Sequence, residues 1–280
     1  MPPYSPSSTT TWKRCPVLWT LGREGIVRRE ISKRDTAAAL GAAFAQAMHV
    51  YHRCRQAGVE PGTAPLQAAE GLWRAQQAAW VSAGRVVPET QQGAVAALWG
   101  HCARLAQYVM DHPLPPEWQV VAVDQPLPDH GYARPDLVMR KPSGDLVVID
   151  YKTTLTLGRT ASERTRKLGY RVAEWRDSDQ LYHYAWAVGA THVMIVLCEV
   201  EPVLKVTMHD FWFERERIEH WARLQEAAWA AMAEHARVGG PIWRAAVHTD
   251  QFGTCEYYDW CYGAEVEREG LYTIQPRGSV

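Results

Sequence analysis

The sequence predicts a mixed α/β fold with a helical elaboration placed before its sheet. Helical spacing of apolar residues dominates up to about residue 116, and strand spacing begins directly after it. The later strands and helices do not alternate regularly, which argues against a doubly wound parallel sheet. A chain of 280 residues suits one large domain, or one core domain with a helical addition.

The N-terminal half contains three helical patterns. An Ala-rich segment begins near Asp35, and either Asp35 or Thr36 is a suitable N-cap. Two further patterns cover about 66–83 and 89–112, and the prolines that follow end the second of them. We therefore expect a flexible N-terminus over residues 1–11 and a helical region over 12–116.

Strand patterns follow at residues 118–127, 136–140 and 146–153. The turn at 141–145 contains Pro and Gly and joins the last two into a hairpin. A charged segment (158–179), a helix (179–190), two strands (192–202 and 203–213) and a long helix (214–237) complete the pattern. We expect a core over 117–240 and a Cys-containing tail over 241–280 that packs on it.

Charge and composition restrict the partners and the compartment. The chain carries 30 basic and 31 acidic residues, whereas a general nucleic-acid binder often has a basic excess. Positive charge would therefore need to be concentrated along one groove to attract phosphates. No apolar stretch has the length of a transmembrane helix, the start lacks the apolar core of a signal peptide, and the six Cys are scattered. We expect a cytoplasmic protein that does not bind a membrane.

The predicted hairpin carries the residues that point to chemistry. Asp150 and Lys152 are two apart on a strand and so project to the same face, and the hairpin brings Asp136 alongside them. Two carboxylates and an ammonium suit phosphodiester hydrolysis, because carboxylates hold Mg²⁺ and a Lys beside the ion stabilises developing negative charge. The alternative is an exposed salt bridge on a surface hairpin. The apolar run before Asp150 disfavours that alternative, since a charge at the end of a buried strand is costly without a role.

The helix that follows adds a polar pair. Gln180 and Tyr184 are spaced i, i+4 and share one helix face. Together they could contact a scissile phosphate and orient Lys152. The alternative is a surface Gln and a partly buried core Tyr.

These motifs in this order resemble a known family. Pro135-Asp136 followed by Asp150-Tyr151-Lys152 is similar to the signature of the PD-(D/E)XK nuclease superfamily. Gln180-x-x-x-Tyr184 resembles the extra motif of its RecB-like branch, which includes AddB-type, CRISPR-associated adaptation and phage exonucleases. The N-terminal TTTWKRCPVLW is similar to the Cys-Pro segment of that branch, and the resemblance spans about residues 8–262.

The resemblance implies a restriction-endonuclease-like αβββαβ core and a Mg²⁺- or Mn²⁺-dependent deoxyribonuclease. Asp136, Asp150 and the Tyr151 backbone carbonyl would hold the metal, Lys152 would position the attacking water, and Gln180 and Tyr184 would contact DNA or the other active-site residues. The implied products carry 5′-phosphate and 3′-hydroxyl ends. The implied setting is recombination, repair, phage DNA metabolism or CRISPR adaptation in a bacterial or phage-infected cell.

The resemblance also implies partners. Single- or double-stranded DNA ends are the expected substrate. The sequence leaves open the polarity of digestion. It also leaves open whether the chain binds a recombination or repair protein, and whether it forms a homo-oligomer.

The sequence departs from the branch at two places. An early helix usually carries Gly-x-x-x-His or Gly-x-x-x-Glu as a further metal ligand, but Gly41 is followed at that spacing by Ala45. His49, one turn further on the same face, is a candidate substitute or an ordinary helix residue, and Glu70 is a weaker candidate.

The second departure concerns an iron–sulfur cluster that several relatives bind through four Cys. Cys15, Cys255 and Cys261 match three of these positions, one short of the usual set. The two alternatives are a lost cluster with relic cysteines, which we favour, and a cluster completed by His248.

Basic residues between the catalytic strand and the Gln180 helix are candidates for DNA binding. A solvated face is the alternative, because acidic residues are interspersed among them. The DNA-binding candidates are Arg134, Arg159, Arg164, Arg166, Lys167 and Arg171.

Two functions of different class therefore compete. The first is a DNA exonuclease or end-processing nuclease. The second is a non-catalytic DNA-binding or scaffolding protein on a degenerate nuclease fold, which the Ala at position 45 would favour. The intact acidic pair and Lys152 favour the first.

Overall fold

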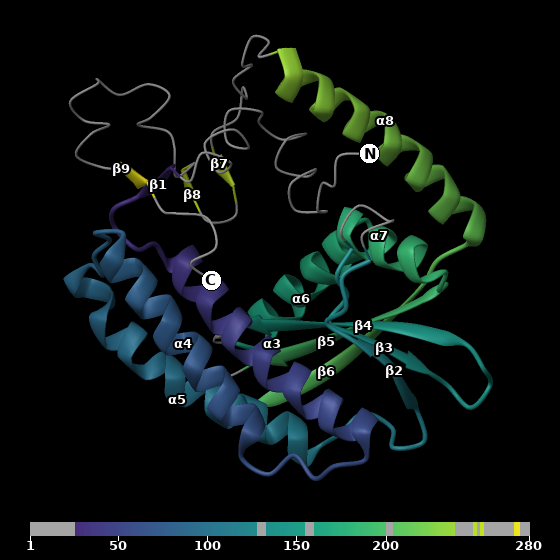
Figure 1. Cartoon of the computed structure of the whole chain (residues 1–280), viewed down its shortest axis with the longest axis horizontal. Helices are drawn as coiled ribbons and strands as arrows, with labels where there is room; N and C mark the ends of the chain where they lie inside the picture. Colours follow the sequence, from purple (N-terminus) through teal and green to yellow (C-terminus); the bar gives the residue numbers. More distant parts are fainter. Residues whose placement is uncertain are drawn as a thin grey trace.

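A computed structural model describes residues 26–127, 133–154, 160–199, 204–238, 249–250, 253–254 and 272–274. A central five-stranded sheet lies between two helical layers (Figure 1). Two short strand pairs lie outside this sheet: β1 (Ile26–Arg28) with β9 (Tyr272–Ile274), and β7 (Thr249–Asp250) with β8 (Gly253–Thr254). In the described part of the chain, no helix has the length and apolar composition needed to cross a membrane.

The first helical layer consists of α3 (Lys33–Ala57), α4 (Ala64–Ser82) and α5 (Glu89–Asp111). Helix α3 begins with a capping box, in which the Ser32 hydroxyl accepts from the Asp35 backbone N–H and the Asp35 carboxylate accepts from the Ser32 N–H. The helix ends at Gly58, whose φ of 67° is the left-handed conformation that glycine adopts without strain. The sequence-based prediction of an N-cap at Asp35 or Thr36 is therefore wrong. Ser32 is the N-cap, and Asp35 is the third residue of the helix.

The sheet is built from β2 (Gln119–Val123), β3 (Leu137–Arg140), β4 (Leu146–Thr154), β5 (His192–Glu199) and β6 (Lys205–Trp212), in the order β2-β3-β4-β5-β6. Strands β4 and β5 are parallel, and all other neighbours are antiparallel. The parallel pair requires a crossover, which α6 and α7 supply. This mixed sheet with its helical N-terminal region confirms the expected fold class.

The crossover and the last helix form the second layer. It contains α6 (Ala161–Arg176), α7 (Asp179–Val188) and α8 (Arg215–Val238). The segment from 158 to 179, for which the sequence predicted only a run of charges, is mostly the helix α6. Thr160 and Glu163 form its capping box, which explains how a segment without any buried residue begins a helix.

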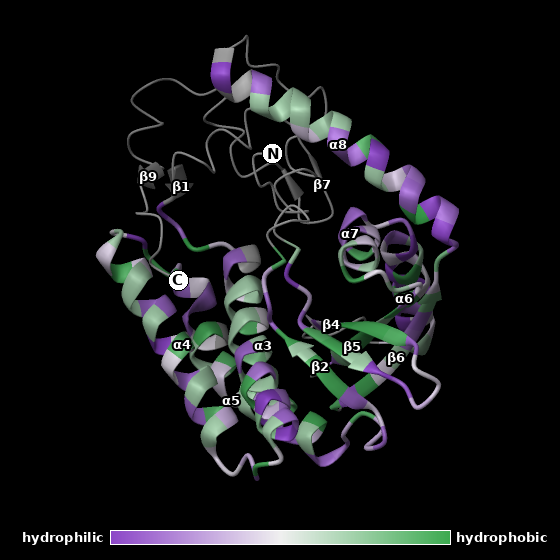
Figure 2. Cartoon of the chain, turned by 45° about the vertical axis from the view of Figure 1, so that its right-hand side comes forward, coloured by the Kyte–Doolittle hydropathy of each residue, from purple (hydrophilic) through white to green (hydrophobic). Residues whose placement is uncertain are grey.

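Successive side chains along each strand pack into two cores, one on each side of the sheet. Val147, Ile149 and Tyr151 of β4 pack toward the α3–α5 layer, whereas Val148 packs with Leu181 and Tyr184 of α7. Strands β4 and β5 are accordingly among the most hydrophobic parts of the chain (Figure 2). Cys102 and Cys198 are buried, as expected for small core residues, and Cys54 is partly buried. The proposed division of the chain at residues 116 and 240 stays a prediction.

Candidate active site

The site lies where β4 extends beyond β3. The last register pair of these strands is Leu137 with Ile149, so β4 continues from Asp150 with only β5 beside it. Asp136 precedes β3 directly and fills this gap: its Oδ2 accepts a hydrogen bond of 2.9 Å from the Tyr151 backbone N–H. The hairpin thus brings Asp136 beside Asp150, as the sequence predicted.

Lys152 is held by two partners. Its Nζ lies 2.7 Å from Asp150 Oδ2 and donates a hydrogen bond of 2.8 Å to Gln180 Oε1. The Gln180 amide in turn donates to the Tyr184 hydroxyl at 2.9 Å. The i, i+4 pair of α7 therefore fixes the ammonium over the same sheet face as Asp150.

Tyr151 points to the other side, as the alternation of a strand requires. Its ring packs edge-on against Phe44, and its hydroxyl lies 2.7 Å from His52 Nε2. Both partners belong to α3, so this contact anchors β4 to the first helical layer.

His49 of α3 lies at the open end of the hairpin, between two carboxylates. Its Nδ1 is 3.3 Å from Asp124 Oδ2, and its Nε2 is 3.5 Å from Asp136 Oδ1. Asp124 follows β2 with a φ of 49°, which is unusual for a residue with a side chain and is best tolerated by Asn and Asp. This backbone conformation lets Asp124 turn its carboxylate toward His49.

Burial and charge shift the protonation of these groups. Burial raises the pKa of Asp150 to about 6; the Lys152 ammonium opposes this shift, and the Asp136 carboxylate adds to it. Burial acts against a charged His49, but the hydrogen bond to Asp124 and the charges of Asp124 and Asp136 outweigh it and raise the pKa of His49. A cation beside the buried Asp150 therefore stabilises its charged form, and Lys152 is that cation in this structure.

The family model of the PD-(D/E)XK nuclease superfamily matches residues 3–262, which is most of the chain. The chain belongs to the PD-(D/E)XK nuclease superfamily. Membership suggests a metal-dependent nuclease. No curated protein matches the chain.

The residues of this PD-(D/E)XK protein fit a divalent ion. His49 Nε2 is buried and faces Asp136 Oδ1 at 3.5 Å, so a neutral His49 would be placed to share an ion with Asp136 while Asp124 holds the other ring nitrogen. Because the N–H and C=O of one strand residue point to the same side, the Tyr151 carbonyl faces the same open edge as its N–H. Among the described residues, no three His, Cys, Asp or Glu side chains lie close enough together to enclose an ion by themselves.

The predicted DNA-binding residues fall into two groups. Some already have protein partners: Arg134 binds Asp124 at 2.6 Å, Arg164 binds the buried Glu199 at 2.7 Å, and Arg171 binds Glu174 at 3.1 Å. Arg166 and Lys167 are exposed on α6, and Arg159 lies outside the described residues. The structure therefore indicates a local structural role for Arg134 and Arg164 that the sequence did not reveal.

The remaining candidates are Glu70 and the iron–sulfur set. Glu70 forms an exposed ion pair with Arg74 on α4. Cys15, His248, Cys255 and Cys261, the candidate iron–sulfur ligands, lie outside the described residues.

Asp124 is the site residue that sequence reasoning missed. A carboxylate directly after β2 was the available signal, since Asp136 stands directly before the neighbouring strand β3. Arg53 of α3 is a second neighbour, with its Nη2 3.7 Å from Asp124 Oδ2.

Proposed function

We propose that this protein is a Mg²⁺- or Mn²⁺-dependent deoxyribonuclease that acts on DNA ends, as an exonuclease or end-processing enzyme. The observation that carries the proposal is the placement of Lys152 between Asp150 and Gln180, beside Asp136. A structural ion pair would need only one acidic partner. Here an amide from a separate helix fixes the same ammonium, which is the preorganisation that catalysis requires.

Each residue has a role in this proposal. Asp136, Asp150, the Tyr151 carbonyl and His49 would hold the ion, which polarises the phosphoryl group and lowers the pKa of a bound water. Lys152 would hold the attacking water and stabilise negative charge on the phosphate. Gln180 and Tyr184 keep Lys152 in place and present polar groups to the DNA.

The setting of the reaction is also a proposal. Gln180 and Tyr184 support assignment to the RecB-like branch, and with it a role in recombination, repair, phage DNA metabolism or CRISPR adaptation. The corresponding location is the cytoplasm of a bacterial or phage-infected cell. A recombination or repair protein and a second copy of the chain are the candidate partners.

The decisive test is degradation of end-labelled linear DNA, single- and double-stranded, with Mg²⁺, with Mn²⁺ and with a chelator. Lys152→Ala and Asp136→Ala should each lower the rate at least about 10²-fold, the usual cost of removing one group that stabilises transition-state charge. Arg104→Gln, an exposed change on α5, is the matched control and should cut like the parent. The positions of the lost label give the polarity.

One observation favours a second candidate, a DNA-binding scaffold on a degenerate nuclease fold. Ala45 stands where the branch carries a metal ligand, and it offers no donor. If the parent protein binds DNA but cuts none of the substrates with either metal, the scaffold function replaces the proposal. Loss of cutting in Lys152→Ala with full activity in Asp136→Ala would contradict the assigned metal site.

A further inference from the structure

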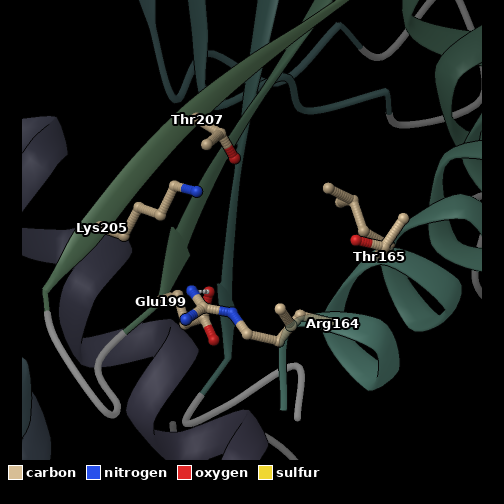
Figure 3. A pocket seen from close by; sticks show the side chains of 7 residues that line it. Arg164, Thr165, Glu199, Lys205 and Thr207 are labelled. Carbon is tan, nitrogen blue, oxygen red and sulfur yellow. Dashed lines mark hydrogen bonds and ion pairs between the residues drawn. The ribbon is translucent and has the colours of Figure 1, made fainter. Parts of the chain in front are cut away.

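A cavity of about 330 Å³ lies between α6 and the end of the sheet. Arg164 and Thr165 line it from α6, Glu199 from the end of β5, and Lys205 and Thr207 from β6 (Figure 3). Its volume is at the lower end of the range of pockets that hold small organic ligands. The proposed reaction uses none of these residues.

The cavity shares the sheet face of the catalytic Lys152. Registered residues of neighbouring strands project to the same face, and Lys152 is in register with Leu197, which is in register with Thr207. The next row on this face contains Thr154, Glu199 and Lys205. With strands about 4.8 Å apart and a rise of about 3.3 Å per residue, Lys205 lies roughly 12 Å from Lys152 along the sheet.

The charges in the cavity leave one ammonium for a ligand. Glu199 is 3% exposed and is neutralised by Arg164, whose Nη2 lies 2.7 Å from its Oε2. In the described part of the chain, Lys205 forms no ion pair, and its ammonium points into the cavity (Figure 3). Thr207 adds a hydroxyl, which lies 3.2 Å from His209 Nε2. An ammonium and a hydroxyl beside a neutralised pair suit one singly charged anion such as a phosphodiester.

We propose that this cavity binds one backbone phosphate of the substrate strand, through Lys205 and Thr207, at a distance from the phosphate that is cut. The proposal rests on the proposed function and specifies how that site holds its substrate. A nucleotide adds 3.4 Å along the axis of a stacked strand, so a separation of roughly 12 Å corresponds to about three or four nucleotides. Arg164 has a structural part here: it neutralises Glu199 so that the cavity accepts an anion.

The test is DNA binding by the full-length chain in a Lys152→Ala background, which prevents cutting. Lys205→Gln should weaken binding of a short labelled DNA about tenfold, the effect of losing one charge-assisted hydrogen bond. It should also reduce the slope of log affinity against log salt by about 1. Lys205→Arg keeps the charge and should retain most of the affinity, and Arg104→Gln should change neither quantity. Thermal unfolding verifies that all variants are folded.

The position of the contact is tested with DNA that carries one neutral methylphosphonate at successive positions. Neutralising the phosphate that Lys205 binds should itself lower the affinity. At that one internal position, Lys205→Gln should lower the affinity no further. If that position is instead the terminal phosphate, so that only 5′-phosphorylated DNA responds to Lys205→Gln, the cavity is an end-binding site and the backbone proposal is wrong.

The two proposals fail in different ways. Unchanged affinity and salt slope in Lys205→Gln, with normal DNA binding by the parent background, overturn the subsite and leave the nuclease function intact. Absence of any DNA binding by the parent background overturns both.

Discussion

The position of Asp150 and Lys152 on one face was predictable from their spacing, because a strand alternates its side chains. The partners of Lys152 were partly predictable, since Gln180 and Tyr184 share a helix face. Asp124 was not predictable from local pattern. Its approach to His49 depends on where α3 crosses the end of β2 and on a positive φ, and both are set by tertiary packing.

Asp124 acts on the proposed metal site through His49. In Asp124→Asn the imidazole loses the carboxylate that orients it, and such partners usually contribute 10- to 100-fold to metal affinity. We therefore expect the Mg²⁺ concentration for half-maximal cutting to rise by about that factor, while the rate at saturating Mg²⁺ falls less. The readout is the dependence of the cutting rate on Mg²⁺ concentration.

Arg134→Gln provides the control for this prediction, because it removes another partner of Asp124 and leaves the carboxylate beside His49 in place. It should shift the Mg²⁺ requirement less than Asp124→Asn does. Equal shifts in both variants would mean that Asp124 holds the loop rather than the histidine.

At the scale of elements, most helices and strands were predictable, but the start of α3 and the helix α6 were not. The periodicity of α4, α5 and α8 gave bounds close to those observed, whereas the N-cap of α3 was placed too late. Asp35 is a good cap residue, but it accepts from the Ser32 N–H and binds Arg85 from a distant helix end. A single sequence does not reveal that long-range ion pair.

The capping box of α3 gives a stability prediction. Ser32→Ala removes the hydroxyl that accepts from the Asp35 N–H, which should lower the free energy of unfolding by about 1 kcal/mol. Urea unfolding of the full chain measures this change. Ser82→Ala is the matched control, since the Ser82 hydroxyl only donates to Ala79 within the last turn of α4. If both substitutions lower the free energy of unfolding equally, the Ser32 hydroxyl does not stabilise α3 as an N-cap.

At the scale of the whole molecule, the sequence predicted a mixed sheet but not which helices cover which face. That arrangement is visible only from the register of β4 with β5 and from the two cores on either side. It also explains why one predicted DNA contact has a structural partner instead: α6 lies over the end of the sheet, where Arg164 forms an ion pair with the buried Glu199.

A buried histidine at the far end of the sheet makes global stability depend on pH. Burial lowers the pKa of His192 below its ordinary 6.5, although Asp210 opposes this shift. The unfolded chain therefore binds a proton at His192 more readily than the folded chain does. The contribution of neutral His192 to the free energy of unfolding is present above pH 6.5 and is lost as the pH falls below 6.5. We expect His192→Gln to reduce the decrease in unfolding free energy between neutral and mildly acidic pH.

The comparison uses denaturant unfolding at several pH values, with His220→Gln, an exposed change on α8, as control. The control should retain the pH dependence of the parent. A decrease in His192→Gln that is as steep as in the parent would assign the acid sensitivity to other groups.

The hydrogen bond from the Tyr151 N–H to Asp136 also restrains that carboxylate. The backbone uses one acceptor site of Oδ2, so Oδ1 is the Asp136 oxygen with more capacity left for an ion. Ca²⁺ takes six to eight oxygens and often uses bidentate carboxylates, whereas Mg²⁺ accepts single oxygens and fills the rest of its octahedron with water. An Asp136 that binds through one oxygen would therefore suit Mg²⁺ better than Ca²⁺.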